Sequence, residues 1–299
     1  MLGATTLWGA MTPIAKNVLE EGLIDGLSLS VLRIGGGAIL FILASLLPRS
    51  ITGDVAVIRR DLWKLLLASM IMISANQGLF IIGIEYTAPV DTSVMCTLTP
   101  VFTLVLAAIF IGQPLNVLKV SGVVIGLGGA LLMAFTDEGS VIAKNPLLGD
   151  MLCLLAQLCA AVYYVFFLDV INKYPPFTIM KWMFIFAGIT YVPCMIPFID
   201  VIPLDSVSVS SLMSLVYIIV FPTFIAYLII PFAQRLLRPT VISIYAYFQP
   251  VVAALIAWIM GLVIFGPLRI IATILIFTGV FLVSTHSTSK NSHIRNIRR

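Results

Sequence analysis

Charged residues are scarce in this chain. Only 10% of its 299 residues are Asp, Glu, Lys or Arg, and 61% are apolar, whereas an ordinary soluble domain is about 25% charged. A soluble protein of this length needs more polar surface than that composition can supply. The mean hydropathy of +1.13 agrees. The composition therefore predicts a protein whose surface faces lipid.

Histidine and cysteine are also scarce. The two histidines, His286 and His293, lie near the C-terminus, and the four cysteines form no C-x-x-C pair. This distribution argues against a Ser-His-Asp set, a metal site and a disulfide framework. The chain also lacks a phosphate-binding glycine loop. We therefore expect no catalytic residues, no metal and no cofactor.

The chain does contain a series of long apolar runs separated by short polar breaks. A helix needs about 20 residues to cross a bilayer, and no break is long enough to hold a soluble domain. The expected spans are 1–17, 27–47, 62–84, 88–111, 117–135, 147–170, 176–198, 207–231, 239–261 and 265–285. We predict an all-α polytopic membrane protein with ten transmembrane helices, in a bacterial plasma (inner) membrane.

Lys and Arg predict the orientation, because cytoplasmic loops of membrane proteins are rich in these residues. If the N-terminus is cytoplasmic, most of them fall at cytoplasmic ends of spans: Arg49, Arg59, Arg60, Lys64, Lys119, Lys173, Lys181, Arg235, Arg238, Lys290, Arg295, Arg298 and Arg299. Only Lys16, Lys144 and Arg269 fall outside. The pattern requires an even number of helices, so both termini are predicted to be cytoplasmic. The basic tail is too short to indicate nucleic acid, and attraction to anionic lipid explains it.

An internal repeat occurs at an offset of 150 residues. Its clearest matches are Pro89 with Pro239, Ser93 with Ser243, and Pro100 with Pro250. The segments 88–111 and 239–261 would then be the fourth span of one half and the fourth span of the other. Because five spans per half is an odd number, the halves must have opposite orientations. Inverted repeats of this kind are typical of transporters, with a substrate site between the halves.

Several motifs are shared with a known family. They are Leu7-Trp8-Gly9 with Pro13-Ile14-Ala15-Lys16, Leu32-Arg33-Ile34, Tyr86-Thr87-Ala88 with Thr99-Pro100 and Gly112-Gln113-Pro114-Leu115, and Gly149-Asp150 with Ala161-Val162-Tyr163. On these motifs the chain resembles the EamA-type family of the drug/metabolite transporter superfamily. The resemblance implies two repeats, 1–135 and 147–287, joined by an outer linker, 136–146, and followed by a basic tail, 288–299. It also implies a basket-like bundle around a central cavity, with the fifth and tenth helices at the back.

The chain departs from the family pattern at two places. The family usually has Glu after the glycine that closes the fourth helix, and this chain has Gln113 there. The second half has Gly261-Leu262 at the comparable place. We expect weaker loop contacts from these changes rather than a loss of transport.

Arg33 and Asp91 are the charged residues expected at membrane depth. A charge there costs at least about 2.5–3.5 kcal/mol on insertion scales, so it usually faces a cavity or a partner. Arg33 would bind an anion or pair with Asp91, although it could instead cap carbonyls or extend towards the headgroups. Asp91 could equally lie at the headgroup boundary. It is also the one good candidate for a proton-coupled residue.

A belt of polar and aromatic residues is expected at similar depth. Its polar members are Thr12, Asn76, Gln77, Thr99, Gln157 and Gln249, and its aromatic members, nearer the middle of the membrane, are Trp8, Tyr163, Tyr164, Tyr245 and Tyr247. Together they would line a wet cavity, although each alone could be an ordinary interhelical hydrogen bond. Pro100 and Pro250 would free carbonyl groups at the cavity or act only as kinks.

These observations predict a secondary transporter that works by alternating access. The family resemblance implies export of small metabolites or amphipathic compounds. A lipid flippase or a non-transporting membrane sensor of the same fold is the alternative, whereas a membrane enzyme would need clusters of Asp, Glu or His. We expect a small-molecule substrate and the lipid bilayer as partners and no nucleic acid. The small-residue face of 117–135 would permit an oligomer without indicating one. The scarcity of acids favours facilitated or exchange transport over obligatory proton coupling.

Overall fold

The computed structural model describes residues 1–22, 24–87, 92, 95–135, 144–198, 208–259 and 266–297. Within these ranges every regular element is helical. The protein is an all-helical polytopic membrane protein with about ten membrane-crossing units, and six of them are long and apolar enough to span a bilayer without a break. The predicted fold class is confirmed at that level.

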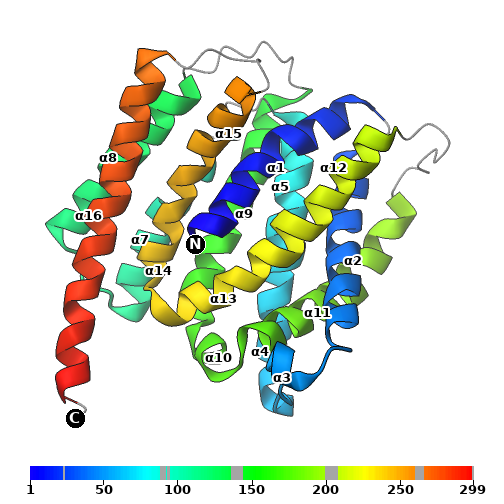
Figure 1. The fold of residues 1–299 in the computed structure, drawn as a ribbon, viewed down its shortest axis with the longest axis horizontal. Helices are drawn as coiled ribbons and strands as arrows, with labels where there is room; N and C mark the ends of the chain where they lie inside the picture. Colours follow the sequence, from blue (N-terminus) through cyan, green and yellow to red (C-terminus); the bar gives the residue numbers. More distant parts are fainter. Residues whose placement is uncertain are drawn as a thin grey trace.

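The first half contains α1 (Leu2–Glu20), α2 (Gly26–Ala44), α3 (Arg49–Thr52), α4 (Arg59–Ser69), η1 (Met70–Ala75), α5 (Asn76–Tyr86), α7 (Thr99–Ile111) and α8 (Val117–Phe135). The second half contains α9 (Pro146–Phe166), α10 (Leu168–Lys173), α11 (Pro176–Met195), η2 (Ile196–Phe198), α12 (Val209–Ile219), η4 (Val220–Ile225), α13 (Ala226–Leu236), α14 (Pro239–Ile244), η5 (Tyr245–Tyr247), α15 (Phe248–Ile259) and α16 (Pro267–Ile297). Figure 1 shows these helices as one bundle.

Some boundaries differ from the sequence prediction. The eighth span continues to Leu236 because η4, a π-helical turn, joins α12 to α13 without a break. The ninth span is interrupted by a 3-10 turn, η5, one turn before Pro250. The last helix continues to Ile297, so the segment predicted as a separate tail is helical as far as the structure describes it. The start of the fourth span, 88–91, lies outside the described residues.

The two halves share their helix boundaries at the offset of 150 residues. Helices α4 and α12, the turns η1 and η4, and helices α5 and α13 each begin and end 150 residues apart. Both η1 and η4 are π-helical, a form that is rare and often found at functional sites. Each half therefore has the same irregularity at the same place in its third span.

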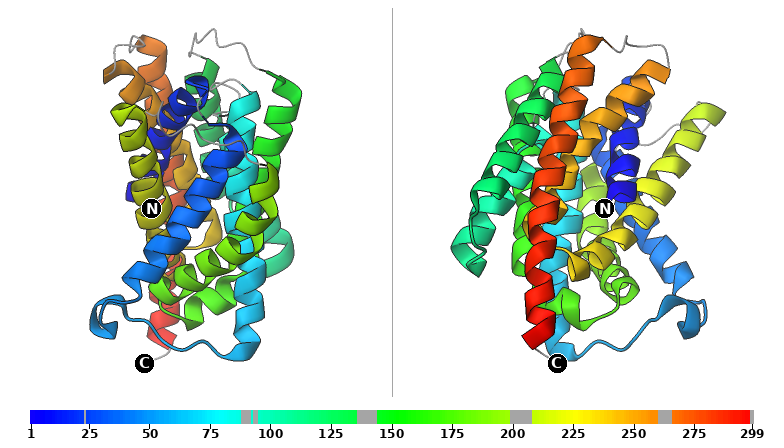
Figure 2. Two further views of the ribbon diagram at one scale, coloured as in Figure 1. Left: turned by 90° about the vertical axis from the view of Figure 1, so that its right-hand side faces the viewer. Right: turned by 60° about the vertical axis from the view of Figure 1, so that its left-hand side comes forward.

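Equivalent helices of the two halves pack antiparallel. The Ser30 hydroxyl on α2 lies 2.9 Å from the Tyr191 hydroxyl on α11, and Gly37 faces Phe184, so residue numbers rise on one helix as they fall on the other. Figure 2 shows α8 and α16 side by side. A Cβ at Gly279 of α16 would lie 2.6 Å from the Gly122 carbonyl oxygen of α8. Only glycine permits backbones to approach this closely.

One end of the bundle carries eight of the 17 Lys and Arg residues. We call it the basic end, and it is defined by Arg49, Arg59, Arg60, Lys64, Lys173, Lys181, Arg235 and Arg238 (lower side of Figure 1). Ion pairs tie α4 and the segment before it to the second half: Asp54 with Lys181, Asp61 with Lys173, and Lys64 with Asp169. The hydrogen bond from Lys173 to Asp61 raises the pKa of the Lys173 ammonium group.

Candidate functional site

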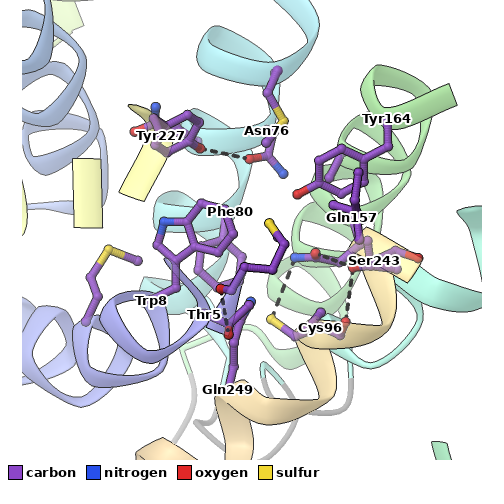
Figure 3. A pocket seen from close by; sticks show the side chains of 18 of the residues that line it. Thr5, Trp8, Asn76, Phe80, Cys96, Gln157, Tyr164, Tyr227, Ser243 and Gln249 are labelled. Carbon is purple, nitrogen blue, oxygen red and sulfur yellow. Dashed lines mark hydrogen bonds between the residues drawn. The ribbon is translucent and has the colours of Figure 1, made fainter. Parts of the chain in front are cut away.

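A cavity lies at the centre of the bundle, between residues of α1, α2, η1, α5, α9, α13 and α14 (Figure 3). The cavity has a volume of about 60 Å³, which is room for a few waters. Eight of the residues predicted for the site line it: Trp8, Arg33, Asn76, Gln77, Thr99, Gln157, Tyr164 and Gln249. The first residue of the chain, Met1, also lines the cavity. The last helix, α16, instead ends at the basic end of the bundle (Figure 1).

A proline in the π-helical turn η4 organises one wall of the cavity. Pro222 has no amide hydrogen, so it cannot donate to the carbonyl of Ile218 one turn earlier. The Thr223 hydroxyl donates to that carbonyl at 2.8 Å and accepts from Arg33 Nε at 3.1 Å. The Pro222 carbonyl accepts from Trp8 Nε1 at 2.8 Å. One backbone irregularity therefore positions both the cation and the indole of the cavity.

Arg33 is a buried cation without a counter-ion among the described residues. Its side chain is 2% exposed, and none of the salt bridges between described residues includes it. Nε donates to the Thr223 hydroxyl at 3.1 Å, and this is the guanidinium's one hydrogen bond to another described residue. The predicted partner, Asp91, lies outside the described residues. A guanidinium in this setting is suited to bind a carboxylate or phosphate through two parallel hydrogen bonds.

The opposite wall presents neutral polar groups. The Thr99 hydroxyl lies 2.7 Å from Gln157 Oε1 and 3.0 Å from the Cys96 carbonyl, and it can donate to one of them at a time. That carbonyl is free because Pro100 follows it by four residues. Asn76 donates to the Ala156 carbonyl at 2.7 Å. This wall can exchange its internal hydrogen bonds for bonds to a bound molecule.

Two further residues are poised for a ligand. Gln77 is 1% exposed, and neither amide atom lies at hydrogen-bond distance and angle from another described residue. Tyr227 donates to Asn76 Oδ1 over a long 3.4 Å, and its ring meets Trp8 edge-on with centroids 5.6 Å apart. Figure 3 shows this aromatic pair facing Tyr164 and Gln157 across the cavity. The cavity thus combines one cation with amides, hydroxyls and aromatic faces.

The remaining predicted residues lie elsewhere. Thr12 and Pro250 line a smaller neighbouring pocket, which Gln249 also reaches. Of the four predicted tyrosines, Tyr164 lines the cavity, whereas Tyr163, Tyr245 and Tyr247 do not. Tyr163 is fully buried in the packed core, and Tyr247 donates to the Val123 carbonyl at 3.1 Å behind the cavity. Tyr245 is partly buried against the hydrophobic cluster that contains Tyr247.

The reason for this displacement is helix geometry. Successive residues on an α-helix point about 100° apart, so Tyr164 reaches the cavity while Tyr163 points into the core. The position of a residue along a helix does not by itself fix the direction in which its side chain points. Pro100 is likewise not a kink within a helix, because it occupies the first turn of α7.

Tyr227 and Thr223 are the important residues that the sequence prediction missed. Tyr227 is the counterpart of Gln77 at the offset of 150 residues, so the repeat contained the signal needed to find it. Thr223 follows a proline inside an apolar run and had no comparable signal. Among the described residues, no group of three or more His, Cys, Asp or Glu side chains could hold a metal ion.

Comparisons with known proteins give a consistent result. The model of the EamA-like transporter family matches residues 1–135 and 147–285. The uncharacterized transporters YdfC and YyaM of Bacillus subtilis (strain 168) are 25% and 20% identical to this chain. The alignments cover 85% of this chain and 79% of YdfC, and 98% of this chain and 97% of YyaM. A solved crystal structure, 18% identical, has the same fold with a TM-score of 0.73 over 96% of both chains.

Proposed function

Because this chain belongs to the EamA-like transporter family, we propose that it exports small amphipathic molecules carrying one anionic group, by alternating access. The family is one of transporters and not of enzymes. The observation that carries the proposal is Arg33, a buried cation that lines the cavity and has no counter-ion among the described residues.

The substrate class follows from the groups around the cavity. An uncompensated charge at membrane depth is costly, and a carboxylate or phosphate on the substrate would offset that cost. The edge-to-face pair of Trp8 and Tyr227 offers an apolar surface for the rest of the molecule. The amides of Gln77 and Gln157 can bind its polar edges. A second positive charge on the substrate would be repelled by Arg33.

Alternating access is supported by the relation between the halves. We propose that residues 1–135 and 147–287 are inverted five-helix repeats. In support, exchanging the equivalent helices turns one set of contacts into another: α1 packs on α15 as α9 packs on α7, and α5 packs on α9 as α13 packs on α1. Equivalent positions also face the cavity in both halves, namely Thr99 with Gln249 and Gln77 with Tyr227. Rocking of such halves around a central site is a known transport mechanism.

The basic end is proposed to be the cytoplasmic face of a bacterial plasma membrane, because cytoplasmic loops are enriched in Lys and Arg. Ser140→Cys and Ser292→Cys, each in a cysteine-free background, test this. A membrane-impermeant thiol reagent added outside should label position 140 and leave position 292 unlabelled. The reverse pattern contradicts the orientation.

Ligand binding tests the substrate class. Three probes share one skeleton: 3-phenylpropanoate, 3-phenylpropanamide and 3-phenylpropylamine. A ligand at about 100 times its dissociation constant adds about 2.7 kcal/mol of stability, so the acid should raise the thermal unfolding temperature more than the amide, and the amine least. Equal shifts for all three would contradict a site built on Arg33.

Transport in proteoliposomes tests the mechanism. We expect counterflow of the anionic probe without any ion gradient, because no carboxylate is among the described residues that line the cavity. Accumulation driven by a pH gradient and abolished by Asp91→Asn would instead show proton coupling. Phospholipid scrambling without probe flux would identify a flippase.

A further inference from the structure

A second pocket lies at the basic end, apart from the central cavity. It is formed where α7 ends, beside α10, and where α13 turns into α14, and it measures about 430 Å³. We propose that it binds the headgroup of an anionic phospholipid with a hydroxylated headgroup, such as phosphatidylglycerol. This inference does not depend on what the central cavity transports.

Two arginines line the pocket. Arg235 is held in place because Nε donates to the Ile171 carbonyl at 3.1 Å and Nη2 donates to the Tyr174 carbonyl. Arg238 forms no ion pair with any described residue. No carboxylate is among the described residues that line this pocket. The positive charge of both guanidinium groups is therefore available to a phosphate group.

Two buried amides in the same pocket lack partners. Gln234 is 3% exposed, and neither Nε2 nor Oε1 has a hydrogen-bond partner. Gln113 donates from Nε2 to the Thr240 hydroxyl at 2.8 Å, but its Oε1 is unpartnered. Buried polar groups in native proteins are nearly always paired. A phosphate oxygen would accept from Gln234, and a headgroup hydroxyl would donate to the free amide oxygens.

The flank of the pocket is apolar and exposed. Leu236 and Ile111 line the pocket and are 76% and 43% exposed. Next to Ile111, Phe110 of α7 meets Phe166 of α9 with ring centroids 5.0 Å apart, and both rings lie on the exposed surface of membrane-crossing helices. Acyl chains would lie along this surface while the headgroup occupies the pocket. Basic pockets between helix ends are the usual sites for such lipids.

Lipid competition in nanodiscs provides the test. Wild-type protein in discs of phosphatidylcholine with a small fraction of phosphatidylglycerol should retain phosphatidylglycerol preferentially, as read by native mass spectrometry after gentle release. Arg238→Gln should weaken that preference about fivefold, because one Arg near the membrane surface strengthens binding to anionic lipid by about that factor. Gln234→Leu should reduce the preference for phosphatidylglycerol over phosphatidic acid, which lacks the glycerol hydroxyls.

Arg60→Gln is the matched control, because Arg60 is an exposed arginine at the same end outside the pocket. It should leave the preference unchanged. Arg238→Lys keeps the charge and should retain most of the preference, which separates binding from misfolding. Equal losses in Arg60→Gln and Arg238→Gln would overturn the site in favour of general attraction to the basic end. Thermal stabilisation by inorganic phosphate equal to that by phosphatidylglycerol would also overturn it, because the site would then bind a free anion.

Discussion

The two π-helical turns, η1 and η4, occupy equivalent places in the two halves but make different contacts with the cavity residues. Turn η4 contains Pro222 and Thr223, which hold Trp8 and Arg33 at the cavity. Turn η1 has Met72 at the position equivalent to Pro222 and forms no such anchor among the described residues. The backbone irregularity has been kept in both halves, while the chemistry attached to it is confined to one.

The positive charge at the cavity also comes from one half and not from the other. Arg33 on α2 has Met183 as its counterpart on α11, and Met183 is fully buried in the apolar core. The cavity therefore receives its cation from one half only. A symmetrical bundle with one off-centre charge can distinguish the two ends of an elongated substrate, which a fully symmetrical site could not do.

Arg33→Met replaces Arg33 with the residue found at the equivalent position of the second half, Met183. This substitution should have the largest effect. A hydrogen bond to a charged group contributes about 1.5–3 kcal/mol, so counterflow of an anionic probe should fall at least about tenfold. Thermal stability should be unchanged or higher, because an unpaired buried charge has been replaced by an apolar side chain of similar size. Flux of the neutral amide that falls to the same degree would show that the variant is defective for other reasons.

Gly279→Ala tests the seam at which the two halves meet. The added Cβ would lie 2.6–2.7 Å from backbone atoms of Gly122 and Gly126, and overpacking of this kind costs about 1–3 kcal/mol. The control is Gly128→Ala on α8, where no heavy atom lies within 4 Å of the added Cβ. That variant should gain about 0.5–1 kcal/mol, as measured by unfolding in mild detergent. Equal stability of the two variants would contradict the close seam.

Thr223→Val removes the hydroxyl that links Arg33 to the carbonyl of Ile218. Both groups would lose their partner, at a cost of about 1–2 kcal/mol in stability. Thr278→Val is the matched control, since the Thr278 hydroxyl makes the same kind of backbone bond at 2.8 Å on an exposed helix face. The control should change stability by less than about 0.5 kcal/mol. If Thr278→Val lost as much stability as Thr223→Val, η4 would have no special role in stability.

Trp8→Phe should have the smallest effect. It removes the bond to the Pro222 carbonyl but keeps an aromatic ring opposite Tyr227. We expect about a fivefold loss in affinity for the aromatic acid, measured by thermal shift titration, since a typical net hydrogen bond contributes about 1 kcal/mol. Trp8→Leu should lose more. If the two variants bind equally, the ring does not contact the ligand.

Much of the fold could be predicted from the sequence. Apolar runs and sparse charge identified the membrane-crossing units, and the matched prolines Pro100 and Pro250 gave the offset at which the third spans of both halves begin and end. The residues Trp8, Arg33, Asn76 and Gln77 were found because polar groups inside apolar runs are few. In such a chain, a polar residue at mid-depth is informative by itself.

Other features could not be predicted. The turns η1 and η4 have the unrelated sequences MIMISA and VFPTFI, so their π-helical form reflects packing against neighbours. Tyr163 and Tyr247 were misplaced because the helices that carry them are apolar on most faces, and periodicity cannot then tell which face meets the cavity. Thr223 gained its role from Arg33, a residue 190 positions away.

That separation has a consequence for how the protein is made. Thr223 leaves the ribosome 190 residues after Arg33, which takes roughly 10–40 s at about 5–20 residues per second. During this interval α2 must enter the bilayer with a guanidinium that has no pocket, and its apolar neighbours Ile34 to Phe41 must offset that cost. The bond between Arg33 and Thr223 therefore cannot form until the second half of the chain has been made.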